Sequence, residues 1–344
     1  MLKTKENIRL RGGFHLQDSF PIRFYNVMER MTFEGQSGEF VFSIPIPEKI
    51  AHVIVNVCPT EPWALPSWVV LEHKTAKFLN KLKALRSHSF PDARCYLAVN
   101  KAENEPVVSA EDYAGDNEWL EVFALDAKYP QDDPVLLAKT ILGIEMSFGK
   151  DPAMHGILIL DAQTVLALYE SGIRGQIVDS RFIALSGSGL RENEVVRVPL
   201  GMPIEKVIRH KAKKSVKHRV FVNGPLRGKE ITDLSQKIDW SIDNIVVLEE
   251  LNHKVLFPML KQAELTSTTN MLGELRRCVF CNFCDDICPV DLEPALYYHA
   301  YERREKGKAR LFHLEKCIEC GLCSYICPSK LELLQIIKEC KALK

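Results

Sequence analysis

The hydrophobic pattern divides the chain into an α/β part, a β-rich part and a helical part. From about Ile44, short continuous apolar runs such as HVIVNV and RCYLAVN alternate with helix-length amphipathic stretches such as VVLEHKTAKFLNKLKAL. Continuous apolar runs are typical of strands buried on both faces, and a 3.6-residue period is typical of the helices that cover such strands. The alternation therefore predicts a parallel sheet covered by helices over residues 44–180.

Beyond Arg181 the pattern changes to short strand-like runs separated by turns. FIALSG, VVRVPLG and HRVFVNG are rich in β-branched and aromatic residues and end on glycine, and a short helix-like stretch begins at Ile204. This pattern predicts a separate β-rich module over residues 181–257. Residues 1–43 are predicted to form an N-terminal extension.

The last part of the chain, residues 258–344, holds eight of the eleven cysteines in two copies of one motif. CVFCNFCDDICP begins at Cys278 and CIECGLCSYICP begins at Cys317, so both have the spacing CxxCxxCxxxCP. Between the motifs, DLEPALYYHAYERREKG places its apolar residues at helical spacing. We therefore expect an all-α ferredoxin module here, with no β-hairpins between the motifs.

The cysteine spacing indicates two [4Fe–4S] clusters. Two-residue gaps let three thiolates of one loop reach one cube, while the fourth cysteine, which precedes proline, ligates the other cluster. The predicted ligands are Cys278, Cys281, Cys284 and Cys327 for cluster one, and Cys317, Cys320, Cys323 and Cys288 for cluster two. A pair of zinc sites would also use CxxC pairs, but it leaves the third cysteine and the proline of each motif unexplained. Gly321 is expected to adopt a positive φ close to the sulfurs.

Composition and charge narrow the classes of partner. Lys plus Arg and Asp plus Glu both number 45, so the chain has no global field that would recruit nucleic acid. The most apolar segments are interrupted before the ~20 residues needed to span a bilayer. The start carries charges from Lys3 and lacks the apolar stretch of a secretory signal, which predicts a cytosolic protein with reduced thiols.

The strongest local charge feature is the basic run RHKAKKSVKHR, residues 209–219. Such a run is typical of a solvated surface, or of a docking patch for an acidic partner or for membrane headgroups.

The C-terminal segments CVFCNFCDDICPVDLEPALYY and LEKCIECGLCSYICPSKLELLQ resemble the C subunit of the Rnf complex, a membrane-associated ferredoxin:NAD oxidoreductase. They also resemble the A subunit of the Na⁺-translocating NADH:quinone reductase, whose matching region has lost its cluster cysteines. Upstream, VIVNVCPTEPWALPSW, RCYLAVNKAENEP and KYPQDDPVLLAKTILG are similar to successive segments of this family. SGLRENEVVRVPLGMPIEKVI and VFVNGPLRGKEI are similar to its soluble-ligand-binding β-grasp module, and GGFHLQDS to the opening of its N-terminal barrel-like domain.

The resemblance implies a fold for each part. Residues 44–180 would form a domain like the flavoprotein subunit of respiratory complex I, residues 181–257 the β-grasp module and residues 258–344 the helical dicluster ferredoxin. Residues 1–43 would be a remnant of the barrel-like domain.

The resemblance also makes Asn56 and Glu61 candidate residues of a flavin pocket. However, flavin-binding members carry Gly-Gly-x-Gly-Phe-Pro-Thr before the first strand, where this chain has FEGQSGEFVFSIPIP, and Glu34 and Glu39 would repel a phosphate. FMN is therefore not expected. The resemblance likewise implies that Tyr129 and Pro130 of the Tyr-Pro segment line this pocket. Without a flavin, Asn56 and Glu61 would be ordinary turn residues, and Tyr129 and Pro130 ordinary loop residues.

The function implied by the resemblance is that of an electron-transfer subunit in an Rnf- or quinone-reductase-like complex. Its expected partners are membrane redox subunits and a soluble ferredoxin or flavoprotein, and it would sit peripherally at the inner face of the membrane. Two alternatives stay open: a self-sufficient flavin- and NADH-dependent reductase acting on a corrinoid or a quinone, and a non-catalytic docking scaffold. Bound flavin would identify the first, and clusters that no physiological donor reduces would identify the second. No residue is singled out for bond-making catalysis.

Overall fold

The computed structural model describes residues 50–71, 74–146, 152–214, 217–249 and 276–342, together with the backbone of four strands within residues 5–45. These strands form one sheet in the order β1-β4-β2-β3. Their bounds are β1 (Lys5–Arg11), β2 (Phe14–His15), β3 (Thr32–Phe33) and β4 (Glu39–Pro45). No helix in the described part of the chain is both long enough and apolar enough to cross a membrane.

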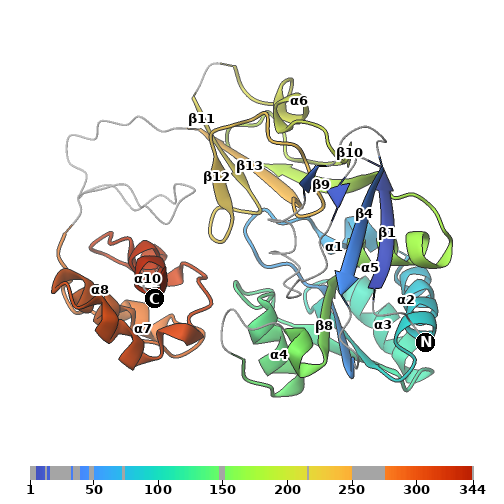
Figure 1. Ribbon diagram of the computed structural model, residues 1–344, viewed down its shortest axis with the longest axis horizontal. Helices are drawn as coiled ribbons and strands as arrows, with labels where there is room; N and C mark the ends of the chain where they lie inside the picture. The colour runs from blue at the N-terminus through green and yellow to red at the C-terminus, as the bar shows by residue number, and fades with distance from the viewer. Residues whose placement is uncertain are drawn as a thin grey trace.

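A four-stranded parallel sheet, in the order β7-β6-β5-β8, forms the centre of the α/β part (Figure 1). Its strands are β5 (His52–Val57), β6 (Arg94–Asn100), β7 (Leu120–Leu125) and β8 (Ile157–Asp161). The accompanying helices are α1 (Ser67–Leu71), α2 (Thr75–Ser89), α3 (Asn104–Gly115), α4 (Pro134–Leu142), η2 (Pro152–His155), α5 (Ala162–Leu168) and η3 (Tyr169–Ile173). The alternation of apolar runs and amphipathic stretches predicted this arrangement.

Both faces of the parallel sheet are buried, because side chains alternate across each strand. Val53 and Val55 of β5 pack in the apolar cluster that contains the buried faces of α2 and α5. Ile54 points to the opposite face, where it joins a second cluster with residues of α4. Ile318 and Cys320 from the C-terminal module belong to this second cluster. The C-terminal module therefore helps to cover one face of the sheet.

Short polar residues start two of the helices next to this sheet. The Asp133 carboxylate accepts a hydrogen bond from the Val135 amide at the start of α4, and Asp161 accepts one from the Thr164 amide at the start of α5. These bonds satisfy amides that have no partner inside the helix. Gly143 ends α4 in the left-handed conformation. Asp133 thus caps α4 in the segment that follows the carboxyl end of β7.

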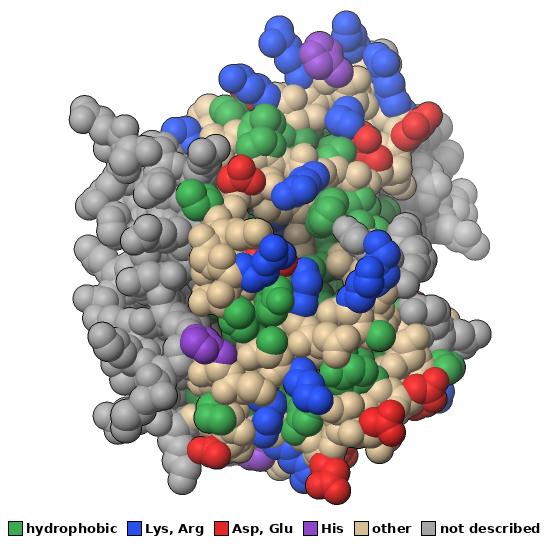
Figure 2. All heavy atoms as spheres, turned by 90° about the vertical axis from the view of Figure 1, so that its right-hand side faces the viewer, with side chains coloured by type: hydrophobic (Ala, Val, Ile, Leu, Met, Phe, Trp, Pro, Cys, Tyr) green, Lys and Arg blue, Asp and Glu red, His purple; other side chains and the backbone are tan. Residues whose placement is uncertain are grey.

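The β-rich module is a five-stranded mixed sheet in the order β10-β9-β13-β11-β12, in which only β13 and β9 are parallel. Its elements are β9 (Ser180–Ser186), β10 (Glu194–Pro199), α6 (Ile204–Ile208), β11 (His218–Val222), β12 (Lys229–Ile231) and β13 (Asn244–Glu249). Lys and Arg side chains gather at the end of the molecule that carries α6 (Figures 1 and 2). The predicted module boundary at residue 257 lies outside the described residues.

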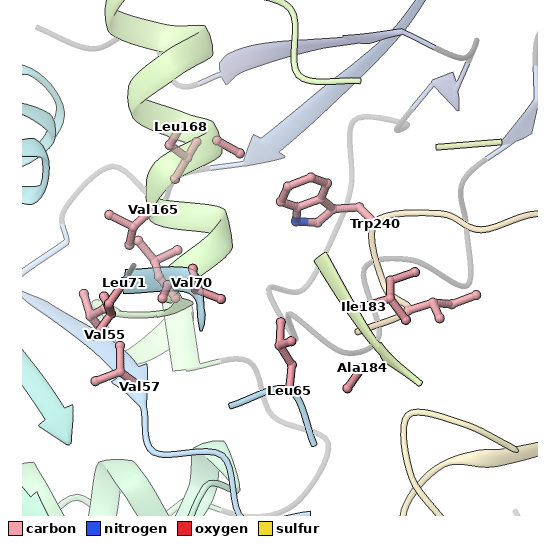
Figure 3. Packing of buried hydrophobic residues seen from close by; sticks show 14 of the residues in the cluster. Val55, Val57, Leu65, Val70, Leu71, Val165, Leu168, Ile183, Ala184 and Trp240 are labelled. Atoms are coloured by element: carbon pink, nitrogen blue, oxygen red, sulfur yellow. The ribbon is translucent and has the colours of Figure 1, made fainter. Parts of the chain in front are cut away.

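The core runs without a break from the parallel sheet into the β-rich module (Figure 3). Trp240 and Ile183 of the β-rich module lie in the same apolar cluster as Val165 of α5 and Val55 of β5. The Trp240 indole donates a hydrogen bond to the buried Thr164 hydroxyl at 3.1 Å. Two parts that the sequence pattern separates are therefore joined by one core.

The described part of the C-terminal module, residues 276–342, contains helices and no strand, as the spacing of its apolar residues predicted. Its elements are α7 (Phe283–Asp286), α8 (Pro294–Glu302), η5 (Lys306–Phe312), η6 (Leu314–Lys316), α9 (Leu322–Ile326) and α10 (Leu333–Ala342). The short helices α7 and α9 contain the third cysteine of each motif, and α8 and α10 follow each proline (Figure 1). The two motifs thus fold as two copies of one unit.

Candidate metal centre

The eight motif cysteines line two separate cavities of the C-terminal module. The first, about 350 Å³ with open solvent included, is lined by Cys278, Cys281, Cys284 and Cys327. The second, about 360 Å³ on the same measure, is lined by Cys288, Cys317, Cys320 and Cys323. In each cavity the fourth cysteine comes from the other motif. These are the two groups of four that the spacing predicted.

The donor chemistry and the lining of the cavities suit iron–sulfur clusters. Four thiols surround each cavity, and the remaining lining side chains are mostly apolar, including Leu331 and Leu333 in the first and Ile318 and Leu322 in the second. Such linings keep water away from a bound cluster. Among the described residues, no group of three or more His, Cys, Asp or Glu side chains is arranged to hold a single metal ion.

Both motifs place residues in the left-handed backbone conformation at matching positions. Between the first and second cysteines, Phe280 of the first motif has a φ of +54° and Glu319 of the second motif has a φ of +57°. Immediately before the helix that contains the third cysteine, Asn282 has a φ of +60° and Gly321 a φ of +79°. The positive φ expected for Gly321 is confirmed. Non-glycine residues in this conformation each cost about 1–2 kcal/mol and persist only where surrounding contacts require them. The two cysteine loops therefore have the same backbone conformation at these positions.

Burial differs between the two groups of cysteines. Cys281 is exposed and Cys278 is half-buried, whereas Cys317, Cys320 and Cys323 are all buried. Burial raises the pKa of the Cys284 thiol and of the Cys320 thiol to about 12. Without a metal these groups are protonated near neutral pH, so binding to iron must release their protons.

The first cavity faces solvent, with exposed apolar side chains around it. Val279, Phe280 and Phe283 have relative exposures of 63%, 66% and 50%. Phe280 stacks on the His299 ring of α8 with centroids 4.4 Å apart. The second cavity has a different environment, because its Ile318 and Cys320 pack against the α/β part.

A hydrogen bond ties the second cysteine loop to the α/β part. The Tyr129 hydroxyl donates to the Cys320 carbonyl oxygen at 2.5 Å. Burial raises the pKa of Tyr129 well above its ordinary value, so its hydroxyl keeps its proton and remains a donor. Tyr129 also stacks under Arg227, whose guanidinium carbon lies 5.2 Å from the centre of the ring.

Arg227, from the loop after β11, reaches the carboxyl edge of the parallel sheet and meets three carboxylates. Its guanidinium contacts Glu61 at 3.4 Å, Asp133 at 3.5 Å and Asp132. The three carboxylate side chains are 7%, 2% and 10% exposed. Glu61 also accepts hydrogen bonds from the Leu226 amide at 2.7 Å and the Arg227 amide at 3.2 Å. The loop is thereby held to the sheet through both its backbone and its side chain.

The charges of this group depend on one another. Burial raises the pKa of Glu61 to about 7, and attraction to Arg227 opposes that rise. Burial likewise raises the pKa of Asp133, again against the effect of Arg227. Burial alone would lower the pKa of Arg227, but Asp132 and the other acidic groups outweigh burial and raise it. Arg227 therefore stays charged, and it is the group that allows these acids to ionise.

The two candidate flavin residues make contacts within the chain itself. The Asn56 side chain accepts a hydrogen bond from the Cys58 amide at 2.9 Å, as in an ordinary Asx turn. Glu61 is engaged with the Arg227 loop, and a Cβ added at Gly224 would lie 2.2 Å from the Glu61 side chain. The glycine-containing stretch from Glu34 to Gly38 lies outside the described residues. A flavin role for Asn56 and Glu61 stays a prediction.

Sequence reasoning missed the group around Arg227. Arg227 and Glu61 are 166 residues apart, and Tyr129 and Cys320 are 191 apart, so no local spacing connects them. The available signals were the acidic pair in KYPQDDP and the single arginine in NGPLRG. Neither the acidic pair nor the arginine predicts which residue its side chain contacts.

The bond from Tyr129 to the Cys320 carbonyl generates a prediction. Replacement of Tyr129 by Phe should raise amide exchange across residues 317–323 about fivefold, because one buried hydrogen bond contributes about 1 kcal/mol. Hydrogen–deuterium exchange measured by mass spectrometry checks this. Tyr113→Phe is the matched control, since the Tyr113 hydroxyl donates to Asn80 at an exposed position. Unchanged exchange in 317–323 of Tyr129→Phe would contradict a stabilising role for this bond.

Comparison with known proteins adds a family for the cysteine region and relatives for most of the chain. Residues 270–328 match the family described as 4Fe-4S dicluster domain. The chain is 25% identical over 253 residues to the C subunit of the Na(+)-translocating ferredoxin:NAD(+) oxidoreductase complex of Acetobacterium woodii, covering 73% of this chain and 53% of that protein. It is 26% identical over 297 residues to the C subunit of an ion-translocating oxidoreductase complex of Edwardsiella ictaluri, covering 86% of this chain and 35% of that protein.

Another C subunit of an ion-translocating oxidoreductase complex, from Pectobacterium carotovorum, is 27% identical over 297 residues, covering 85% of this chain and 37% of that protein. The chain thus spans about half or less of the length of these relatives. Among solved structures, a chain of an NAD⁺-reducing [NiFe]-hydrogenase in the H₂-reduced state aligns with a TM-score of 0.46 and 13% identity, covering 60% of this chain and 43% of that one. The chain therefore has homologues named as C subunits of ion-translocating oxidoreductase complexes, and its residues 270–328 match the family described as 4Fe-4S dicluster domain.

Proposed function

We propose that the chain is an electron-transfer subunit with two [4Fe–4S] clusters in a membrane-associated redox complex of the Rnf or quinone-reductase type. The observation that carries the proposal is the lining of the two cavities, in which four cysteines meet at each and the fourth comes from the other motif. The proposed ligands are Cys278, Cys281, Cys284 and Cys327 in one cavity, and Cys317, Cys320, Cys323 and Cys288 in the other.

The chain places the two cavities next to each other. Cys284 lines the first and Cys288 the second, and four residues of chain span at most about 14 Å even when fully extended. In the second motif, Cys323 lines the second cavity and Cys327, four residues later, lines the first. A cluster bound in each cavity would accept and release one electron at a time. The crossed cysteines would then hold the two one-electron carriers at a fixed short separation.

The surroundings give the two cavities different roles. The first lies next to exposed Cys281 and exposed apolar side chains, so the chain offers a redox partner close approach there. The second is shielded by the α/β part through Ile318 and the Tyr129 hydrogen bond. We infer that electrons enter or leave the chain on the side of the first cavity.

The names of the relatives support a proposal for partners and location. Those relatives are named as subunits of ion-translocating oxidoreductase complexes. We propose that this chain docks on membrane redox subunits at the inner face of the membrane and exchanges electrons with a soluble ferredoxin or flavoprotein. Its parts would be an N-terminal extension of residues 1–43, the complex I flavoprotein-like domain of 44–180, the β-grasp module of 181–257 and the ferredoxin domain of 258–344.

The metal content tests the proposal directly. Anaerobically purified protein should contain about eight iron and about eight sulfide per chain, because each CxxCxxCxxxCP unit supplies the ligands for one cubane. Iron, sulfide and flavin are measured on the same sample, and reductive titration is followed by electron paramagnetic resonance. About four iron, or zinc in place of iron, would contradict the proposal, and stoichiometric flavin would favour a self-sufficient reductase.

Exchange of the fourth cysteine predicts which cluster a substitution damages. Cys288→Ala should leave a paramagnetic spectrum that matches that of Cys317→Ala and differs from that of Cys281→Ala, because Cys288 lines the second cavity. Cys340→Ala is the matched control, since Cys340 is a buried cysteine of the same module outside both cavities. It should keep both clusters. A Cys288→Ala spectrum like that of Cys281→Ala would refute the crossed ligation.

The isolated chain is predicted not to oxidise NADH. One-electron clusters cannot accept a hydride without a flavin to divide it, and Glu61 at the candidate flavin position is engaged with the Arg227 loop. Reconstituted protein is mixed with NADH and an artificial acceptor, with and without FMN, and then with a reduced low-potential ferredoxin. We expect cluster bleaching only with the ferredoxin. Rapid FMN-dependent turnover of NADH would overturn this prediction.

A further inference from the structure

The β-rich module carries a concentration of positive charge that the electron-transfer function leaves unexplained. Residues 206–219 contain seven Lys or Arg and no Asp or Glu, in a chain whose charges balance overall. We use the name basic patch for the exposed Lys, Arg and His side chains of this region and of the adjacent turn, which are Arg191, Lys206, Arg209, His210, Lys214 and Lys217.

The fold brings these side chains together from three segments. Lys206 lies in α6, and the chain from Arg209 continues into the loop before β11. The turn before β10 lies against that loop, because the Arg191 amide donates to the Lys211 carbonyl at 3.0 Å and the Lys213 amide donates to the Gly189 carbonyl at 2.9 Å. The charges of the basic patch are therefore fixed on one end of a folded module.

Two of the neighbouring acids are already engaged in ion pairs. Lys211 pairs with Glu194, and Lys213 pairs with Glu249 at 2.7 Å. Two further acids, Glu192 and Glu205, are exposed near the patch. No ion pair joins either of them to a cation of the basic patch among the described residues. The patch keeps an excess of positive charge after these acids are counted.

In the residues that the structure describes, the surface of the patch is charged and exposes no large hydrophobic side chain. The large hydrophobic side chains that are exposed in the described residues lie elsewhere, the nearest along the chain being Ile177 and Val279. Protein interfaces usually depend on a few buried aromatic or aliphatic anchors, and no exposed large hydrophobic side chain of the described residues belongs to the patch. A phospholipid surface needs no such anchor, because its anionic headgroups adjust to flexible Lys and Arg side chains.

We infer that the basic patch binds the anionic phospholipid headgroups of a membrane surface. Clusters of four to eight Lys or Arg are typical of sites that adsorb to anionic lipid, and each cation strengthens adsorption about fivefold. Lys206 lies in α6, and Lys and Arg side chains gather at the end of the molecule that carries α6, away from α7, α8 and α10 (Figures 1 and 2). Lipid contact there leaves the first cavity accessible to a redox partner.

Co-sedimentation of the full chain with vesicles tests this inference. The chain should bind mixed vesicles of phosphatidylcholine and phosphatidylglycerol but not vesicles of phosphatidylcholine alone, and added salt should weaken binding because it screens surface charge. The combined variant Lys206→Gln, Arg209→Gln, Lys214→Gln and Lys217→Gln should bind the mixed vesicles at least about 100-fold more weakly. Circular dichroism and the visible spectrum confirm that the variant is folded and keeps its metal.

A matched control removes the same number of charges from the α/β part. Lys77, Lys101 and Lys128 are exposed there, as is Lys83, and their joint replacement by Gln should leave vesicle binding within about twofold of the unaltered chain. Failure of the unaltered chain to bind the mixed vesicles would overturn the inference. Equal losses in the two variants would also overturn it, since net charge alone would then explain binding. Binding to polyglutamate without binding to mixed vesicles would assign the patch to an acidic protein instead.

Discussion

The guanidinium of Arg227 is the interaction on which the arrangement of the three parts depends. It comes from the β-rich module, it meets three nearly buried carboxylates at the edge of the parallel sheet, and it stacks on the tyrosine that bonds the second cysteine loop. Buried carboxylates without a cation are strongly destabilising, so removal of Arg227 would leave all three carboxylates without their cation and lower the stability of the fold. One side chain therefore links the β-rich module, the α/β part and, through Tyr129, the C-terminal module.

This interaction also changes what the α/β part can do. Open parallel sheets usually bind ligands in the crevice beyond the carboxyl ends of their strands. Here the loop of Leu226 and Arg227 lies against Glu61 at that edge, and its backbone amides donate to the carboxylate. The Glu61 carboxylate and these two amides are therefore hydrogen-bonded to each other within the chain. The proposed role of this part is therefore to support and shield the second cysteine loop.

In the C-terminal module, a different and local constraint acts on the backbone of the two cysteine loops. Each cysteine loop must turn three thiols toward one cavity within a few residues, and the chain does this with left-handed residues at Phe280, Asn282, Glu319 and Gly321. Only one of the four is glycine, so the other three carry backbone strain. Apolar packing around both cavities holds this backbone, so the thiols come together only in the folded module. Metal binding and folding of the module are therefore expected to be coupled.

The sequence by itself determined the features that rest on local chemistry. The spacing of cysteines identified the two groups of four, including the exchange of Cys288 and Cys327, because ligand reach over two or three residues is set by covalent geometry. Apolar periodicity identified the parallel strands and the helical character of residues 276–342. Only the tertiary structure decided the partners of Arg227 and Tyr129, the exposure of Cys281 and the burial of Cys317, Cys320 and Cys323. Those contacts join residues more than 90 positions apart, and a single ionic or hydroxyl side chain leaves no periodic signal of the partner it will meet.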